Sequence, residues 1–320
     1  MVKLAERFTL KLSPSSAPYS FHFTASAYSF SFMYDGQTLL LQLSSKPPSI
    51  ALIKEVDDVL EAKVYSERPL SVGDVEDELR FQLGLDEDLS DFYDKASSDP
   101  LLKSVGSKLR GMHLKCIPPW PAFMVALCQQ NASFKQGWRL VHRLLSSLGS
   151  QAEVDGRLAL LYPSPAKVVE AGLEALRSLG LGFRAKPLWG AAKYVIDNLG
   201  LSEDVEARHL ESLSSVKGVG EYTLRVALLF SARRYEPPPV DRWLVKVMSE
   251  AYEVRLKGVG EAEALLRSRW AGWGGLYAFF ATIVTDAEPG AKAVERVRKG
   301  LVEPSFNFNL LTPMTMWRHL

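Results

Sequence analysis

The spacing of apolar residues changes near residue 86, and this change constrains the fold more than any other feature of the chain. Before it, apolar residues alternate or form short runs, as in strands, in FTLKLS, YSFHFT, YSFSFMY, QTLLLQL, ALIKEV and LEAKVYS. Asp35-Gly36 is placed as a hairpin turn between the third and fourth segments. Beyond residue 86 the spacing is helical. The sequence therefore predicts an α+β fold, with a small antiparallel β domain over residues 1–89 and an all-α body over 90–320.

Residues typical of helix starts and ends occur along the predicted helical body. Ser90 and Asp99-Pro100 are typical helix starts, and Ser164-Pro165 and Gly180 delimit a further helix. The stretch 121–149 is long and apolar enough for a central pair of helices, whereas the tail 301–320 has no clear period.

Composition excludes several classes of protein. The chain carries 38 basic and 37 acidic residues, so its net charge of +1 gives no global signal for nucleic acid. No apolar run approaches membrane-spanning length and the N-terminus lacks a signal peptide, which predicts a cytoplasmic protein without a membrane partner. Cys116 and Cys128 are too few to ligate an iron–sulfur cluster and are expected to be buried apolar residues. The five histidines are scattered, so we expect no metal site and no cofactor.

The pentapeptide Lys-Gly-Val-Gly-Glu occurs at residues 217–221 and again at 257–261. Around the first copy, residues 205–232 place apolar residues at helical spacing on both sides of the turn. Gly218 and Gly220 permit a tight turn, and the N–H groups that open the following helix suit a phosphate oxygen. This is the pattern of a helix–hairpin–helix motif, with a plain helical hairpin as the alternative.

Glutamates follow the second copy at positions 261 and 263. They lie where a phosphate would have to bind, and they favour the start of a helix themselves. The second copy is therefore predicted to be a turn that joins helices and does not contact DNA.

Asp241 lies in the segment 237–250, after three prolines and before an amphipathic helix. It follows Gly220 by 21 residues, which is enough for one helix and a short loop to return near the turn. Taken alone, Asp241 is equally well explained as the N-cap of that helix.

The hairpin, the spacing and Val240-Asp241 together resemble the helix–hairpin–helix DNA glycosylase superfamily, in the clade of 8-oxoguanine and bacterial-type 3-methyladenine DNA glycosylases. These enzymes flip a damaged nucleotide out of double-stranded DNA and cut its N-glycosidic bond. The resemblance extends to residues 128–149, 179–186 and 269–280. It implies that Asp241 is catalytic, that damaged double-stranded DNA is the partner, and that the protein acts as a monomer. A monovalent cation at the hairpin would also be consistent with it.

Bifunctional members of that superfamily place a lysine two residues after the second glycine of the hairpin. This position is Tyr222 here, and a phenol cannot form a Schiff base. The departure predicts a monofunctional enzyme that uses water as nucleophile and lacks AP lyase activity. Lys193 and Lys246 remain as other candidate amines.

The predicted base pocket comprises Tyr222, Val226, Gly275 and Phe279. Gly275 and Val226 occupy the positions of two residues that read 8-oxoguanine in the resembled family, whereas Phe279 keeps the stacking aromatic. Such a pocket suits electron-poor alkylated bases, which stack well on aromatic faces. Ordinary core packing is an equal alternative for Phe279. For the whole chain, the alternatives are a glycosylase for oxidised, deaminated or mismatched bases, and a non-catalytic DNA-binding protein.

Predicted DNA contacts come from three segments. Phe183 and Arg184 match a wedge and the residue that meets the unpaired base, with a solvated loop as the alternative for Arg184. The hairpin supplies a second set of contacts: Lys217, Gly218, Val219, Gly220 and Arg225. The junction of the central helix pair is expected to fill the gap in the duplex with Gln130 and Asn131. Further basic residues form a local patch that the net charge hides, although Arg233 and Arg234 in particular are expected to be merely solvated: Arg233, Arg234, Arg242 and Lys246.

Overall fold

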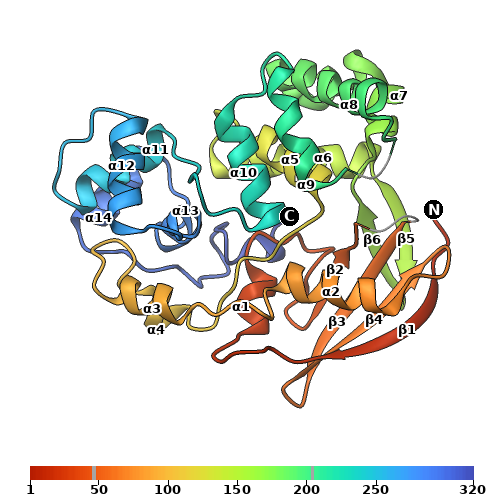
Figure 1. The fold of residues 1–320 in the computed structure, drawn as a ribbon, viewed down its shortest axis with the longest axis horizontal. Helices are drawn as coiled ribbons and strands as arrows, with labels where there is room; N and C mark the ends of the chain where they lie inside the picture. The colour runs from red at the N-terminus through yellow and green to blue at the C-terminus, as the bar shows by residue number, and fades with distance from the viewer. Residues whose placement is uncertain (45–47, 203–204) are drawn as a thin grey trace.

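The N-terminal part of the chain forms an antiparallel sheet in the order β1-β4-β3-β2 (Figure 1). The structure is a computed structural model that describes residues 1–44, 48–202 and 205–320. Directly opposite residues such as Leu41, Ala51 and Val64 share one apolar face of the sheet. The antiparallel sheet predicted from the sequence is confirmed. Its strands are β1 (Ala5–Leu12), β2 (Thr38–Gln42), β3 (Ser49–Val56) and β4 (Val59–Ser66).

Helix α2 (Val72–Leu83) covers this face of the sheet, together with α1 (Phe21–Ser26). Ser71 caps α2 by accepting a hydrogen bond from the Asp74 N–H at 3.4 Å, and Gly84 ends the helix with a φ of 73°. Strands were predicted up to residue 85, so α2 corrects that prediction.

A second antiparallel pair packs on the opposite face of the sheet. Strands β5 (Ser150–Val154) and β6 (Arg157–Leu161) bury Ala152 and Leu161 against Ile50 and Leu52. Their turn, Asp155-Gly156, has φ angles of 50° and 72°, as a tight two-residue hairpin requires. The predicted all-α body is therefore helical apart from this hairpin.

Two predicted strands, at residues 19–24 and 28–34, were wrong. The first is α1, which Ser20 caps by accepting a hydrogen bond from the Phe23 N–H at 3.3 Å, and the second is a series of turns. The alternating aromatic residues of these segments are divided between two cores, with Phe21 and Tyr34 in the cluster beneath the sheet and Phe30 in that of the helical body. Asp35-Gly36 does form a turn, but only an isolated bridge between Tyr34 and Leu39 joins the chain beside it.

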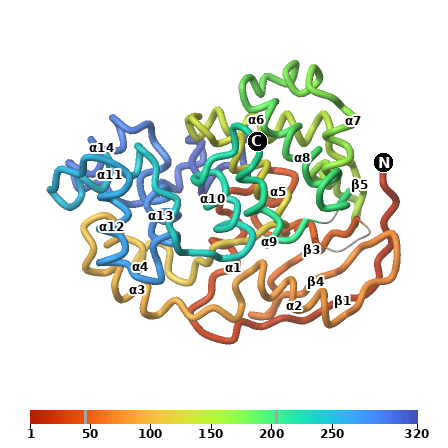
Figure 2. The backbone as a smooth tube through the Cα atoms, turned by 45° about the horizontal axis from the view of Figure 1, so that its top comes forward, coloured from red at the N-terminus to blue at the C-terminus, as the bar shows by residue number. Residues whose placement is uncertain are grey.

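The helical body has two lobes, each with its own buried apolar cluster (Figures 1 and 2). The first lobe contains α5 (Pro119–Gln129), α6 (Phe134–Leu148), α7 (Pro165–Leu176), α8 (Ala185–Leu199), α9 (Ala207–Leu210) and α10 (Glu221–Ala232). The second contains α3 (Ser90–Ser97), α4 (Val105–Lys108), α11 (Arg242–Ala251), α12 (Val259–Arg269), α13 (Gly274–Val284) and α14 (Gly290–Arg298).

The two lobes share the chain in an interleaved order. The chain enters the second lobe at α3, builds the whole first lobe, and returns to the second lobe at α11 (Figure 1). The tail then runs back to the sheet, where Trp317 is buried with α1 and α2. Within the described residues, no helix combines the length and apolar character needed to cross a bilayer.

Candidate active site

The first Lys-Gly-Val-Gly-Glu forms a turn between two helical segments. The turn follows α9 and the 3₁₀ helix η3 (Glu211–Ser215) and leads into α10. Gly218 has a φ of +95°, where a side chain would be strained, and Val219 is buried. Gly220 is the N-cap of α10 and supplies no side-chain acceptor. The first N–H groups of α10 are thus left for another acceptor, which a phosphate can supply.

The second pentapeptide has a different structure. Gly258 is the N-cap of α12, in extended backbone with a φ of 179°, and Gly260 already belongs to the helix. The Glu261 carboxylate lies in the first turn of α12 and accepts a hydrogen bond from the Lys257 N–H at 2.8 Å, so its negative charge disfavours an external anion there. This copy joins α11 to α12, as the sequence predicted.

Asp241 is the N-cap of α11, and its Oδ1 accepts a hydrogen bond from the Leu244 N–H at 2.8 Å. The three preceding prolines bring the chain from α10 to this point, so that Asp241 and Tyr222 line the same cavity. Burial raises the pKa of Asp241 above its ordinary value, and the N–H groups of Leu244 and Trp243 offset part of that rise. Burial and the nearby Asp241 carboxylate raise the pKa of Tyr222, which stays a neutral phenol at physiological pH.

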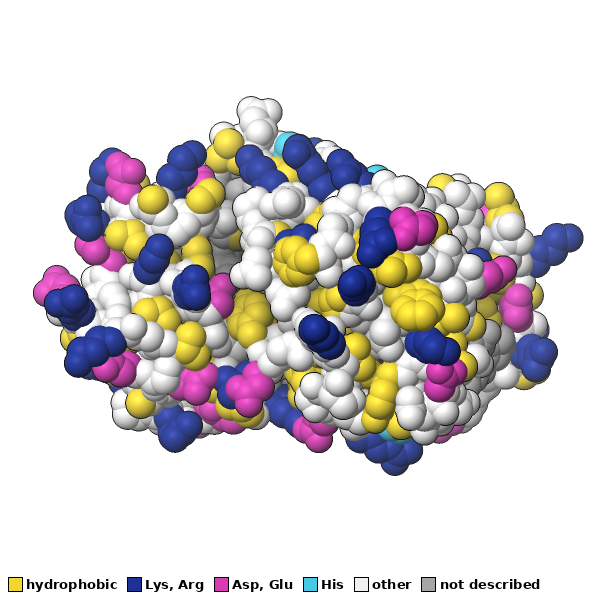
Figure 3. Space-filling view, turned by 90° about the horizontal axis from the view of Figure 1, so that it is seen from above, with side chains coloured by type: hydrophobic (Ala, Val, Ile, Leu, Met, Phe, Trp, Pro, Cys, Tyr) yellow, Lys and Arg dark blue, Asp and Glu magenta, His cyan; other side chains and the backbone are white. Residues whose placement is uncertain are grey.

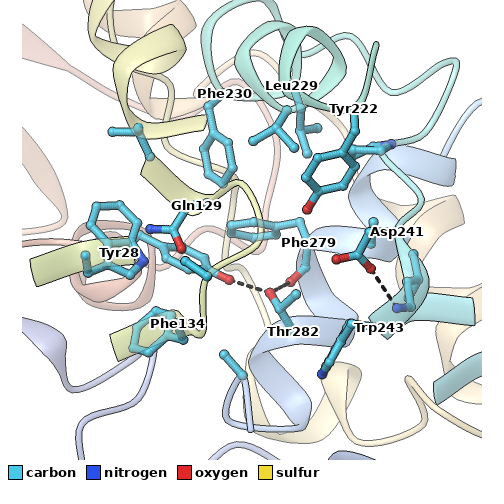
Figure 4. Close-up of a pocket in the computed structure, with 18 of the residues that line it drawn as sticks. Tyr28, Gln129, Phe134, Tyr222, Leu229, Phe230, Asp241, Trp243, Phe279 and Thr282 are labelled. Atoms are coloured by element: carbon cyan, nitrogen blue, oxygen red, sulfur yellow. Dashed lines mark hydrogen bonds between the residues drawn. The ribbon is translucent and has the colours of Figure 1, made fainter. Parts of the chain in front are cut away.

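The cavity lies between the two lobes, has a volume of about 210 Å³ and is called here the aromatic cavity. Figure 4 shows Asp241 and Tyr222 on one side of it and Tyr28, Gln129 and Phe134 on the other. Seven aromatic side chains line it: Tyr28, Phe134, Trp138, Tyr222, Phe230, Trp243 and Phe279. This size and lining suit a planar, electron-poor ring.

Three of the four predicted pocket residues, Tyr222, Val226 and Phe279, line the aromatic cavity. Gly275 does not, which corrects the prediction made for it. Its N–H donates to the Tyr235 carbonyl at 2.7 Å, and a Cβ on it would lie 2.8 Å from the Tyr235 Cα. Gly275 therefore allows α13 to approach the backbone of Tyr235 closely.

Tyr28 is the wall residue that sequence reasoning missed most completely. It comes from the N-terminal region and has a φ of 54°. Its ring stacks on Trp138, with ring centroids 5.7 Å apart, and contacts Phe279 at 5.6 Å. Thr282 Oγ1 donates to the Phe279 carbonyl at 2.7 Å, so towards Tyr28 it can only accept, and the Tyr28 hydroxyl donates to it (Figure 4). Tyr28 therefore offers a bound ring its face.

Few hydrogen-bonding groups in the aromatic cavity remain uncommitted. Trp243 Nε1 donates to the Glu288 carbonyl at 2.8 Å. The Gln129 side-chain amide lines the cavity, and its buried nitrogen has no hydrogen-bond partner among the described residues. The missing side chain of Gly137 makes room for this amide, because a Cβ there would lie 2.2 Å from Gln129 Oε1. Gln129 is thus a second wall residue that the sequence did not reveal.

Among the described residues, no lysine lines the aromatic cavity. Lys193 forms an exposed ion pair with Asp197 at 2.8 Å, and Lys246 lies in a separate surface groove beside α14. Lys115 is close behind the cavity wall, and burial lowers its pKa to about 7. Its ammonium donates to the carbonyls of Ala25 and Ala27 and to Ser29 Oγ, which uses all three of its donors.

Residues from all three segments predicted to contact DNA are joined by hydrogen bonds. Gln130 lies in the junction between α5 and α6, and its Nε2 donates to the Gly218 carbonyl of the hairpin at 3.3 Å. Arg184 Nε donates to the Gln130 carbonyl at 3.0 Å and its guanidinium stacks on Phe183. Phe183 and Asn131 are exposed, whereas Arg184 is only 5% exposed. The solvated-loop alternative for Arg184 was therefore wrong.

Two of the predicted basic contacts are engaged within the protein. Arg225 forms ion pairs with Glu263 and, at 3.1 Å, with Glu221, so its charge is largely neutralised. Arg233 was expected to be solvated, but only 9% of its side chain is exposed, and it pairs with Glu87 at 3.0 Å, which ties the end of α10 to the N-terminal region. This corrects the prediction for Arg233. Lys217 is exposed at the hairpin.

Other Lys and Arg side chains are spread across the face shown in Figure 3, and a hollow lies between its two lobes. Within the described residues, no three His, Cys, Asp or Glu side chains gather as a metal site would require. Cys116 and Cys128 are buried free thiols, as predicted.

Comparison with known proteins relates this structure to DNA glycosylases of similar fold. No family model matches the chain. It is 25% identical over 226 residues to the N-glycosylase/DNA lyase OGG1 of Arabidopsis thaliana, a match that covers 65% of this chain and 61% of that protein. The 3-methyladenine DNA glycosylase of Archaeoglobus fulgidus aligns with a TM-score of 0.70 at 18% identity, covering 85% of this chain and 96% of the other. MBOgg1 in complex with a low-affinity DNA ligand aligns with a TM-score of 0.63 at 18% identity, covering 93% and 99%.

The chain therefore shares the fold of the helix–hairpin–helix DNA glycosylases. The match spans about three-fifths of the length of the plant relative. One of these proteins is named as a lyase and another as a 3-methyladenine enzyme, so the shared fold leaves the excised base and the type of chemistry open.

Proposed function

We propose that this protein is a helix–hairpin–helix DNA glycosylase, and a monofunctional one, which extrudes an alkylated base from double-stranded DNA and hydrolyses its N-glycosidic bond. The observation that carries the proposal is one carboxylate, Asp241, in a cavity with seven aromatic walls and no lining lysine among the described residues. An ionised carboxylate beside the sugar stabilises the positive charge that develops as the base departs. The aromatic faces favour a base that carries positive charge before it leaves.

Water is the proposed nucleophile. Backbone N–H groups hold the Asp241 carboxylate at the cavity, and no side chain among the described residues bonds to it, so it can orient water or face the sugar. At the lysine position of bifunctional enzymes, Tyr222 cannot form a Schiff base. Lys115 is not the proposed nucleophile either, because its amino group is held by three hydrogen bonds within the protein.

The hairpin is the proposed anchor on the DNA backbone. The uncapped N-terminus of α10 and Lys217 would meet phosphates, while Asn131 and Phe183 would occupy the distorted duplex. Extrusion costs a few kcal/mol, which such contacts offset. We further propose that the protein acts in the cytoplasm as a monomer, without a cofactor.

The test is excision from duplexes that carry 3-methyladenine, 8-oxoguanine, hypoxanthine or uracil, each with and without alkali. We expect 3-methyladenine to be released fastest, with strand breaks only after alkali and no covalent adduct on borohydride reduction. Strand cleavage without alkali, or a trapped adduct, would refute the monofunctional mechanism. Fastest release of another base would refute the alkylated substrate, and tight DNA binding without release of any base would favour a non-catalytic binder.

A further inference from the structure

Lys115 is a buried lysine that the proposed chemistry does not use. It is 6% exposed, and within the described part of the chain no Asp or Glu pairs with it. Its ammonium donates to the Ala25 carbonyl at 2.9 Å, to the Ala27 carbonyl at 3.3 Å and to Ser29 Oγ. Burying an amino group away from water costs free energy even when it has such partners, so the presence of a lysine at this position needs an explanation.

The three acceptors of Lys115 lie on both sides of Tyr28. Tyr28 has a φ of 54°, a left-handed backbone conformation that is strained for a non-glycine residue. Its N–H donates to the Pro313 carbonyl at 2.9 Å and its hydroxyl to Thr282. Lys115 holds the residues immediately before and after it, so the segment 25–29 presents the tyrosine in one orientation.

Tyr28 connects this segment to the aromatic cavity. Its ring forms part of the wall beside Phe134 and Trp138. Lys115 lies on the other side of that wall, where it lines with Tyr28 a void of about 20 Å³. The ammonium is therefore within reach of the Tyr28 backbone but separated from anything bound in the cavity.

We propose that Lys115 is a positioning residue for base recognition, which acts on the extruded base only through Tyr28. The proposal rests on the proposed glycosylase function. It differs from a general role in stability, because it predicts that the effect of Lys115 on excision disappears when the Tyr28 ring is absent.

The test is a double-mutant cycle with Lys115→Met, Tyr28→Ala and the combined variant, read by single-turnover excision of 3-methyladenine. We expect each single change to slow excision at least tenfold. In the Tyr28→Ala background, Lys115→Met should change the rate less than twofold. Multiplying effects in the double variant would overturn the proposal. Lys193→Met, which removes an exposed lysine, is the matched control and should leave excision unchanged.

The affinity for a duplex with an abasic-site analogue is measured as well, because a general loss of structure would weaken this binding. This ligand has no base to contact Tyr28, so Lys115→Met should bind it within twofold of the wild type. A parallel loss of binding and excision would overturn the proposal. If Lys115→Met fails to fold, Ser29→Ala removes one acceptor with less disruption and enters the same cycle. If the wild type releases no base from any duplex, the proposed function itself is refuted, whereas additive variants of an active enzyme refute only the role of Lys115.

Discussion

The two identical pentapeptides predict opposite effects for the same substitution. Gly218 has a φ of +95°, and an added Cβ would lie 3.2 Å from the Pro187 Cγ. Gly218→Ala therefore combines backbone strain with a close contact, and we expect a loss of about 1–3 kcal/mol in the free energy of unfolding. Gly260 lies in the first turn of α12, with nothing within 4 Å of its missing Cβ. Gly260→Ala should gain about 0.5–1 kcal/mol, because alanine loses less entropy in a helix.

The two variants should thus differ by about 1.5–4 kcal/mol, measured by urea unfolding at one pH and salt concentration. For a chain of this length, 1 kcal/mol corresponds to about 2 °C in Tm, so thermal unfolding gives a second measurement. Equal destabilisation by both substitutions would refute the assignment of a strained turn to the first copy and a helix start to the second.

Binding to DNA gives an independent test of the same assignment. A charge-assisted hydrogen bond contributes about 1.5–3 kcal/mol, so displacing the first turn of α10 should weaken binding roughly 10- to 100-fold. We expect this loss for Gly218→Ala and unchanged binding for Gly260→Ala. Equal losses at the two glycines would show that the second copy also contacts the backbone.

Three further predictions concern buried charges. Asp241→Asn should slow single-turnover excision at least ~100-fold, yet raise the free energy of unfolding at pH 7. The reason for the gain in stability is that burial raises the pKa of Asp241, so its ionised carboxylate lowers the stability of the folded state once the pH exceeds that pKa. Excision near the wild-type rate, or a less stable variant, would contradict this. Burial lowers the pKa of Lys115 from 10.5 to about 7, so the unfolded chain binds more protons than the folded chain between these pH values. The free energy of unfolding of the wild type should therefore rise with pH relative to that of Lys115→Met, by up to about 5 kcal/mol. A difference in urea unfolding that stays constant with pH would contradict this. Arg233→Met should lower the free energy of unfolding by about 1–3 kcal/mol, because it leaves the largely buried Glu87 carboxylate without its cation. Arg234→Met, from an exposed pair, should cost about 0–1 kcal/mol, and equal losses would show that the Arg233 pair is exposed in solution.

The sequence revealed the features that depend on local chemistry. Two glycines, a following helix and Asp241 at a fixed distance predicted the hairpin and the N-cap that lies in the cavity. Alternation predicted the four strands of the sheet correctly and failed at residues 19–34, where Ser20 caps a helix and the aromatic residues are divided between two cores. The hairpin at Asp155-Gly156 and the helix between Ser71 and Gly84 had ordinary local signals, so both could have been predicted.

The remaining site residues depend on contacts between distant parts of the chain. Tyr28 and Thr282 are 254 positions apart, and nothing in either local sequence indicates that the two hydroxyls meet. Arg225 has the same local character as a phosphate-binding arginine, but Glu263, 38 positions later, pairs with it. Gly275 was placed in the pocket because of its position in the motif, yet the side of α13 that carries it packs on Tyr235. A motif specifies residue positions along the chain, whereas tertiary packing decides which of them face the cavity.

The two interpretations of Asp241, helix cap and catalytic carboxylate, are compatible in the structure. A cap uses one carboxylate oxygen, here Oδ1 with the Leu244 N–H, and this bond restricts the side chain to few orientations. The same contact holds the second oxygen at the cavity without a further side-chain partner among the described residues, and burial there raises the pKa of the group. A carboxylate that was only a cap would gain nothing from a buried, partly aromatic site, because an exposed aspartate caps equally well. The burial of Asp241 is therefore the feature that a capping role leaves unexplained and that a role in stabilising a nearby positive charge accounts for.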